Sequence, residues 1–471
     1  MLGACAVLVM SFLLFGCASF SPDAGMDAVA AIVGDELKKD VVAIRTIDQA
    51  EAARHKMRSL LGRTLTADAA VQIALLNNRG LQAAYDELAL AEAKLVEGSL
   101  PPNPRFSIER LSGPLEIEIE RRIVANILAL ATLPARAEIA AVRFRQAQLR
   151  AAEETLRVAA ETRRSFYRAV AARQLIGLLA QAQTAAETAA KLTTRLGETG
   201  AINKLDQARE QVFYAELTAQ LATTRQRAAS EREALTRRLG VWGSELDFKL
   251  PSALPALPRR PQTLAGIEVD AVRRRVDLQV ARMELDALAR SFGLTQATRF
   301  INLLEVSGIA KTIKEKETGE VIRDRGFEIE FQIPLFDFGE VRVRQAKATY
   351  MQAVNRLTEK AINVRSEARD AYRIYRSAYD IAGHYRQEVL PLRKIISDET
   401  LLRYNVMQID VFALLVEARQ RINANVAAIE AQREFWLAMT DLSVAIVGGG
   451  VVGSRAEAAR PMGDSGGEAQ H

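Results

Sequence analysis

The sequence contains few of the residues from which catalytic and metal sites are built. Only three histidines occur among 471 residues, and they are widely separated at positions 55, 384 and 471. A metal site needs several ligands that converge at fixed spacing, and no such cluster is visible. No glycine-rich loop is followed by the lysine and the serine or threonine that cradle a phosphate. We therefore expect that the protein is not an enzyme and binds no metal.

Aromatic residues and long apolar runs are also scarce. Only 6% of the residues are aromatic and 26% are charged, with much Ala, Leu, Arg, Glu and Gln, a composition typical of long helices. No run of about 18 apolar residues occurs, so we expect no transmembrane helix, and any spanning part must be made of strands. The net charge is only +5, with both signs interspersed, which argues against nucleic-acid binding.

The N-terminus carries a short apolar segment that ends at a cysteine. Residues 6–16 are apolar but too few to span a bilayer, as in a secretory signal peptide. Leu14-Phe15-Gly16-Cys17 is similar to a bacterial lipobox, whose cysteine receives a diacylglycerol; a plain secretory signal is the alternative. If Cys17 is acylated and Cys5 leaves with the signal, no disulfide can form. We expect a covalent lipid on Cys17, and we expect no cofactor.

The chain also repeats itself in order. Three pairs of segments match, at offsets of 278 − 81 = 197, 328 − 116 = 212 and 403 − 195 = 208. The matching pairs are Leu81-Gln82 with Leu278-Gln279, Glu116-Ile117-Glu118 with Glu328-Ile329-Glu330, and Arg195 with Arg403. The difference of 15 residues between the first two offsets equals the length of the charged stretch 311–325, which we place in a loop. The shared order indicates an internal duplication.

Each copy is predicted to contain a helix, a β-hairpin, a long helix, a turn and a further helix. Helical spacing of apolar residues predicts the helices, and two-residue alternation predicts the strands. Pro391 is expected to kink the long helix of the second copy. The first copy comprises helix 66–97, strands 105–111 and 116–124, and helices 134–196 and 203–239. The second comprises helix 267–292, strands 299–308 and 326–333, and helices 340–404 and 409–445.

The end of the last predicted strand is the most informative part of the sequence. Residues 327–333 alternate aromatic or aliphatic side chains with acids or an amide, which suits a sheet between lipid and water. Pro334 ends the strand because it has no N–H to donate. Asp337 and Gly339 then form the corner into the long helix. This strand-to-helix junction resembles the hallmark of the TolC-like outer-membrane efflux proteins.

Two further stretches resemble the same family, and the similarity covers about residues 65–445. Pro102-Asn103-Pro104-Arg105-Phe106 looks like the family's passage from the first helix to the first strand. Residues 403–419 resemble the tip between the last two helices, with Met407 where the family has glycine. The resemblance implies a mostly α fold with a small β part, in which the duplicated units form an α-helical tunnel. Four strands per chain would contribute to a trimeric twelve-stranded β-barrel.

Four strands are too few to close a membrane barrel, for which about eight are needed, so partner copies are expected on physical grounds as well. The resulting segments are a signal peptide with lipobox at 1–17, an N-terminal periplasmic segment at 18–64, a first repeat at 65–248, a proline-rich connector at 249–264, a second repeat at 265–445 and a disordered tail at 446–471. The connector cannot be helical because of its prolines.

The resemblance and the strand pattern together single out three groups of residues. Alternation places a set of acids on the lumen side of the barrel, and the junction residues are those named above. The expected adaptor contacts at the tips are Arg195, Gly197, Gly200 and Asn203, with Arg403, Tyr404 and Asp410. The expected lumen acids are Glu116, Glu118, Glu328 and Glu330. For Arg403 and Asp410 the alternative is that they pair with neighbours or cap helix ends.

The function implied is an outer-membrane channel of a tripartite efflux system, a passive exit duct for small molecules or metal ions. Its partners would be further copies of itself in a homotrimer, a periplasmic adaptor protein, an inner-membrane pump and outer-membrane lipid. The chain would be lipid-anchored in the outer membrane of a bacterial cell and extend into the periplasm. The alternatives are a lipid-tethered periplasmic coiled-coil scaffold or adaptor without a pore, and an exit duct for type I protein secretion.

Overall fold

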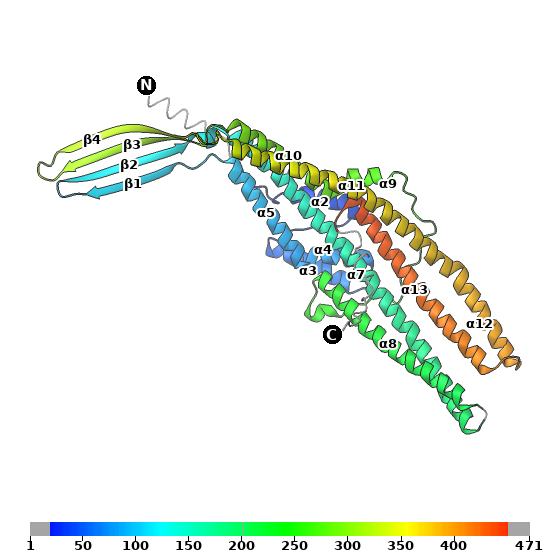
Figure 1. The fold of residues 1–471 in the computed structure, drawn as a ribbon. Helices are drawn as coiled ribbons and strands as arrows, with labels where there is room; N and C mark the ends of the chain where they lie inside the picture. The colour runs from blue at the N-terminus through cyan, green and yellow to red at the C-terminus, as the bar shows by residue number, and fades with distance from the viewer. Residues whose placement is uncertain (1–18, 201, 451–471) are drawn as a thin grey trace, which may run out of the picture. The chain divides into compact units, whose positions relative to one another are not determined.

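The computed structural model describes residues 19–200 and 202–450. The predicted signal peptide, the lipobox with Cys17 and tail residues 451–471 lie outside the described residues. The described chain is mostly α-helical and contains a four-stranded antiparallel sheet (Figure 1). The expected mostly α fold with a small β part is therefore confirmed. Among the described residues, we find no helix whose length and hydropathy would let it cross a bilayer.

The elements follow the predicted order in both copies, which confirms the duplicated unit. The N-terminal segment forms α2 (Met26–Leu37) and α3 (Ile47–Leu61). The first copy contains α4 (Ala67–Asn77), α5 (Arg79–Ser99), β1 (Arg105–Ser112), β2 (Glu116–Asn126), α6 (Ile127–Ala131), α7 (Leu133–Glu198), α8 (Lys204–Leu239) and the 3-10 turn η1 (Gly243–Leu246). The second contains α9 (Ile267–Arg274), α10 (Val276–Ala297), β3 (Leu303–Glu315), β4 (Val321–Gln332), α11 (Glu340–His384), the π-helical turn η2 (Tyr385–Val389), α12 (Leu390–Asn405) and α13 (Val411–Val447).

The first helix of each copy is broken where the sequence predicted a continuous helix. Asn78 has a ψ of 114° between α4 and α5, and its side-chain oxygen accepts the N–H of Leu81 at 3.1 Å. Arg275 has a ψ of 118° between α9 and α10. The two breaks are 275 − 78 = 197 residues apart, the offset of the sequence repeat. Because apolar residues keep helical spacing on both sides of each break, periodicity did not reveal the breaks.

The charged stretch 311–325 is not the loop that we predicted. β3 continues to Glu315 and β4 begins at Val321, so that only residues 316–320 form the turn. Lys311 lies opposite Asp324 in the continuous ladder. Charged residues are compatible with these strands because β4 is exposed along its whole length. The insertion in the second copy therefore lengthens its hairpin.

The long helix of the second copy is interrupted as predicted. α11 ends at His384, η2 follows, and α12 begins at Leu390 with Pro391 in its first turn. Proline has no N–H to donate and its ring crowds the preceding turn, so the regular hydrogen-bond ladder cannot pass through this position. The π-helical turn accommodates the missing hydrogen bond just before the proline.

The chain divides into two compact units, and each takes segments from both sequence copies. Unit 1 contains residues 19–29, Tyr85–Ala151 and Asp277–Ala361. Its sheet has the strand order β1-β2-β3-β4, visible in Figure 1. β2 pairs with β3, which places the hairpins of the two copies side by side. The strands of the two sequence copies thus form one shared sheet.

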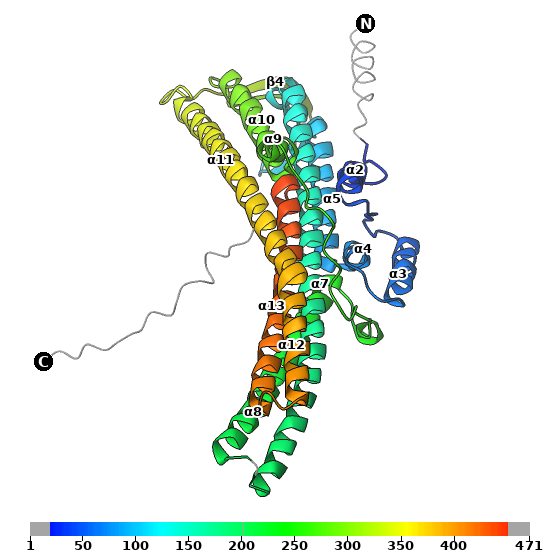
Figure 2. The same cartoon turned by 90° about the vertical axis from the view of Figure 1, so that its right-hand side faces the viewer.

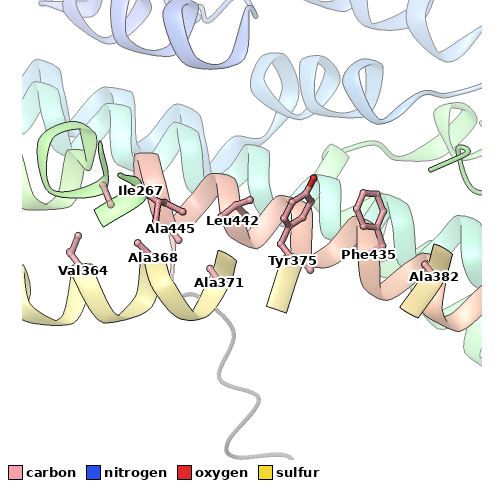
Figure 3. Close-up of a cluster of buried hydrophobic side chains, with 11 residues drawn as sticks. Ile267, Val364, Ala368, Ala371, Tyr375, Ala382, Phe435, Leu442 and Ala445 are labelled. Carbon is pink, nitrogen blue, oxygen red and sulfur yellow. The ribbon is translucent and has the colours of Figure 1, made fainter. Parts of the chain in front are cut away.

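Unit 2 contains Ala30–Ala84, Ala152–Val276 and residues 362–450. Figure 2 shows α12 and α13 lying side by side as a helical hairpin, and α8 runs antiparallel beside the second half of α7. A core cluster joins α9, α11 and α13 around Tyr375 and Phe435 (Figure 3). The Tyr375 hydroxyl accepts the Gln262 N–H at 2.9 Å, and Tyr379 donates to the carbonyl of Pro258 at 3.1 Å. These tyrosines therefore hold the proline-rich connector against the core.

Candidate functional site

The predicted junction lies in unit 1, directly after β4. The carbonyl of Pro334 accepts the Phe338 N–H at 2.8 Å, which closes the turn. The Asp337 carboxylate accepts the N–H groups of Gly339 at 3.0 Å and Val341 at 3.3 Å. Gly339 immediately precedes α11 and Val341 lies in its first turn, where N–H groups have no partner within the helix. Asp337 therefore caps α11 and fixes the corner.

Gly339 is required at this corner by both its backbone angle and its surroundings. Its φ is +72°, a left-handed conformation that side chains other than glycine adopt at a cost. A Cβ atom placed on Gly339 would lie 2.2 Å from the carbonyl oxygen of Arg299. The Arg299 Nε in turn donates to the Phe338 carbonyl at 2.8 Å. The end of α10 and the start of α11 are therefore held in close contact at the base of the sheet.

The predicted lumen acids lie together on one face of the sheet. Residues directly opposite each other on neighbouring antiparallel strands share a face. The register pairs Glu118 with Leu111 and Ile313, and it pairs Glu328 with Ser307. Nine acids on the four strands share this acidic face: Glu109, Glu116, Glu118, Glu120, Glu305, Glu315, Asp324, Glu328 and Glu330.

Three basic residues on the acidic face neutralise part of its charge. Lys311 lies 2.6 Å from Glu118, and Arg105 lies 2.5 Å from Glu305. The Arg122 guanidinium bridges Glu120 at 3.0 Å and Glu328 at 2.8 Å. Sequence alternation placed the acids but not these pairings, because Arg122 and Glu328 come from different hairpins. The acidic face keeps an excess of six negative charges, since nine acids face three bases.

The opposite face of the sheet is apolar near the helices. Phe106, Ile123 and Phe327 lie in one row across it, and Ile329 and Phe331 follow along β4. Phe327 is 78% exposed and Phe331 is 60% exposed. Such a large exposed apolar surface marks a contact with lipid or with another protein. One sheet thus carries an acidic face, on which Glu305 is buried, and an exposed apolar face.

The predicted tip residues lie at the two helical turns of unit 2. The Asn203 side chain accepts the Asp206 N–H at 2.9 Å and caps α8, and the Asp410 side chain accepts the Ala413 N–H at 2.9 Å and caps α13. Arg403 lies 3.4 Å from Glu399 on its own helix. Arg195 is exposed and lines an open groove between α7 and α8. Gly197 and Tyr404 are half-buried near the turns.

The two turns are copies of one another. α7 and α12 end 405 − 198 = 207 residues apart, and α8 and α13 begin 411 − 204 = 207 apart. Our alignment of Arg195 with Arg403 at offset 208 was therefore wrong by one residue, because Leu196 occupies the position of Arg403. Gly200 and Met407 occupy equivalent positions with φ values of +76° and +60°. Met407 thus adopts the left-handed conformation without being glycine.

A buried ion pair behind the tips was not predicted from the sequence. The Glu210 side chain on α8 is 3% exposed, and Arg419 on α13 donates to it at 3.2 Å. The Arg419 guanidinium also covers the ring of Phe213 at 4.1 Å. Burial raises the pKa of the Glu210 carboxyl, and the positive charge of Arg419 opposes this shift. Both residues lie within charged helical stretches, and nothing in the sequence of these stretches predicts that the two side chains form a pair.

Within the described ranges, no group of three or more His, Cys, Asp or Glu side chains could hold a metal ion. His384 is exposed, and its Nδ1 lies 3.2 Å from Glu388 one turn further along the helix. Among the described residues, histidine therefore belongs to no group of this kind.

Neither a family model nor a curated protein matches the sequence, but solved structures do. CusC, for which transmembrane channel formation is described, is 16% identical, with 84% of this chain and 92% of CusC covered and a TM-score of 0.67. The Campylobacter jejuni outer membrane channel CmeC is 17% identical, with 81% of this chain and 86% of CmeC covered and a TM-score of 0.67. The outer-membrane channel OprN is 17% identical, with 87% of this chain and 97% of OprN covered and a TM-score of 0.68. The chain therefore has the fold of these outer-membrane channels, as the resemblance to TolC-like proteins implied.

Proposed function

We propose that this protein is the outer-membrane channel of a tripartite efflux system, a passive exit duct for small molecules or metal ions. The observation that carries the proposal is the sheet with one acidic face and one exposed apolar face, in a chain with the fold of outer-membrane channels. A sheet of this kind suits a wall between water and lipid. The chain would perform no catalysis and need no cofactor, since an inner-membrane pump would supply the energy.

The strand order supports a homotrimer. β1 and β4 each pair on one side only within the described sheet. Open strand edges leave N–H and C=O groups without partners, which lipid does not tolerate. Pairing β4 of one copy with β1 of the next would satisfy these groups, and three copies would supply twelve strands. The acidic face would then line a water-filled interior.

The helical turns of unit 2 would form the contact with a periplasmic adaptor protein. Arg195, Gly200 and Asn203 are exposed at one turn, and Arg403 and Asp410 at the other. Asn203 and Asp410 also cap their helices, so that a contact role would be added to a structural one. A diacylglycerol on Cys17 would anchor the chain in the outer membrane.

The first test is the native mass and the conductance of the protein extracted from outer membranes. We expect a species of three copies of the mature chain that conducts ions in planar bilayers. A non-conducting monomer in the soluble fraction would contradict the proposal and favour a periplasmic scaffold. A conducting trimer that co-purifies with a protein-secretion system would instead favour a type I secretion duct.

Charge reversal on the acidic face should change ion selectivity. In the E118K/E330K variant every copy gains four positive charges relative to the native lumen, so we expect the preference for cations to disappear or invert. The measurement is the reversal potential in a salt gradient across a planar bilayer. The control E51K/E233K changes two exposed helical acids by the same amount and should leave selectivity unchanged. Unchanged selectivity in E118K/E330K would show that these acids do not line the conducting path.

A further inference from the structure

The apolar face of the sheet carries a second feature that the channel function does not explain. Five basic residues lie on this face near the hairpin turns, and no acidic residue lies on it within the four strands. We call this set the basic collar: Arg110, Arg121, Lys314, Arg323 and Arg325. The sheet thus separates charge by face, with nine acids on one side and five bases without acids on the other.

The pairing of the basic residues differs between the two faces. Arg105, Arg122 and Lys311 on the acidic face all form ion pairs within the sheet. All five residues of the basic collar are exposed, and in the described structure none of them has an ion pair or a side-chain hydrogen bond. Cations grouped without counter-charges repel one another, so the collar is suited to an external anion.

The collar has a defined position along the strands. The three rows across the sheet that contain Arg121, Arg110 and Lys314 hold all five bases. The rows from Phe327 toward the helices contain no charge on this face. From Phe327 to Ile333 the strand direction covers six residue steps, about 20 Å. This approaches the apolar band of about 25 Å that membrane-spanning sheets present to lipid. Phe336 and Phe338, which follow β4 in the sequence, are also exposed.

We propose that the basic collar binds the phosphate groups of phosphorylated lipid headgroups at the membrane surface distal to the helices. The inference rests on the proposed function, because the apolar rows must lie in hydrocarbon to bring the collar to headgroup level. Four of the five residues are arginines, whose planar guanidinium groups hold phosphate through two hydrogen bonds. Their aliphatic stems can lie along the lipid chains while the charges reach the headgroups.

Assembly with further copies would strengthen the collar. A copy that pairs edge to edge continues the same alternation, so it presents the same face to lipid. That face contributes five more bases and no strand acid per copy. The neighbouring copies therefore bring no counter-charge within their strands, so that a lipid phosphate could supply the anion.

The test measures lipid binding by the full-length protein in detergent, with native mass spectrometry as the readout. The probes are phosphatidic acid and diacylglycerol with the same acyl chains, which differ only in the phosphate. We expect the wild type to bind phosphatidic acid more tightly, and R121Q/R323Q/R325Q to lose about tenfold or more of that binding. Raised salt should weaken the wild-type binding, and excess inorganic phosphate should compete only weakly if the lipid is the ligand.

Two variants make the result decisive. R225Q/R227Q/R237Q removes three exposed arginines from α8 and should bind phosphatidic acid like the wild type. R121K/R323K/R325K keeps the charge but not the forked donors, so we expect it to bind less tightly than the wild type and more tightly than R121Q/R323Q/R325Q. This graded order would not arise from misfolding. Equal binding of the two lipids, or an R121Q/R323Q/R325Q variant that binds like the wild type, would overturn the inference. Lost conductance would instead count against the proposed function.

Discussion

Replacing Gly339 with alanine is expected to destabilise the strand-to-helix corner by about 3 kcal/mol or more, because backbone strain and a steric clash add together. The left-handed φ of +72° disfavours any side chain, and the new Cβ would lie 2.2 Å from the carbonyl oxygen of Arg299. That oxygen belongs to the backbone, so it cannot move aside as a flexible side chain could. The measurement is the unfolding midpoint of the extracted protein, together with its yield in outer membranes.

Gly319 provides a matched control for this prediction. Its φ is +71°, almost the same as that of Gly339, but a Cβ there would meet nothing within 4 Å. Gly319→Ala therefore imposes the backbone strain alone, and we expect a loss of about 1 kcal/mol. If the two variants were equally stable, the close approach of Arg299 would contribute nothing, and the corner would be more adaptable than its geometry indicates.

Replacing Arg419 with glutamine should destabilise the contact between α8 and α13 by about 2–3 kcal/mol at neutral pH. The substitution leaves the Glu210 carboxylate buried without its cation, and one of its oxygens, Oε2, already lacks a hydrogen-bond partner. The cost lies below that of a fully buried pair because the Arg419 side chain is 33% exposed. The measurement is the free energy of unfolding against pH, with exposed Arg225→Gln as the control.

The pH dependence of this variant has a defined sign. Burial raises the folded-state pKa of Glu210 above the ordinary value of 4.5 for a glutamate, so the folded state holds the proton more tightly than the unfolded state. Stability therefore falls as the pH rises from 4.5 through the folded-state pKa. The positive charge of Arg419 lowers the Glu210 pKa, so its removal raises that pKa further. R419Q should therefore regain stability on acidification, because the buried carboxylate becomes protonated and neutral. The double variant E210Q/R419Q should lack this recovery; an identical pH profile would rule out Glu210 as its source.

Local features of the fold could be predicted because neighbouring residues alone determine them. Pro334 cannot donate to a strand ladder, and Asp337 caps the helix that follows it a few residues later. The alternation in residues 327–333 predicts which side chains share a face, because the strand period of two does not depend on the partner strand. The interruption before Pro391 has the same local origin.

Long-range features required the tertiary structure. Two ion pairs, Glu210 with Arg419 and Arg122 with Glu328, join residues about 200 positions apart. The residues around each member do not indicate which distant residue it pairs with. Stretch 311–325 forms strands because the neighbouring strands supply hydrogen-bond partners, although its charges suggested a loop.

The duplicated order of elements and the two-sided character of the strands could be derived from the residues alone, since these follow from backbone chemistry and residue spacing. The three-dimensional fold was needed to show that β2 pairs with β3, where the first helices break, and that five bases collect on one face of the sheet without a strand acid. The physical reason is that pairing register and ion-pair partners depend on which segments meet in space.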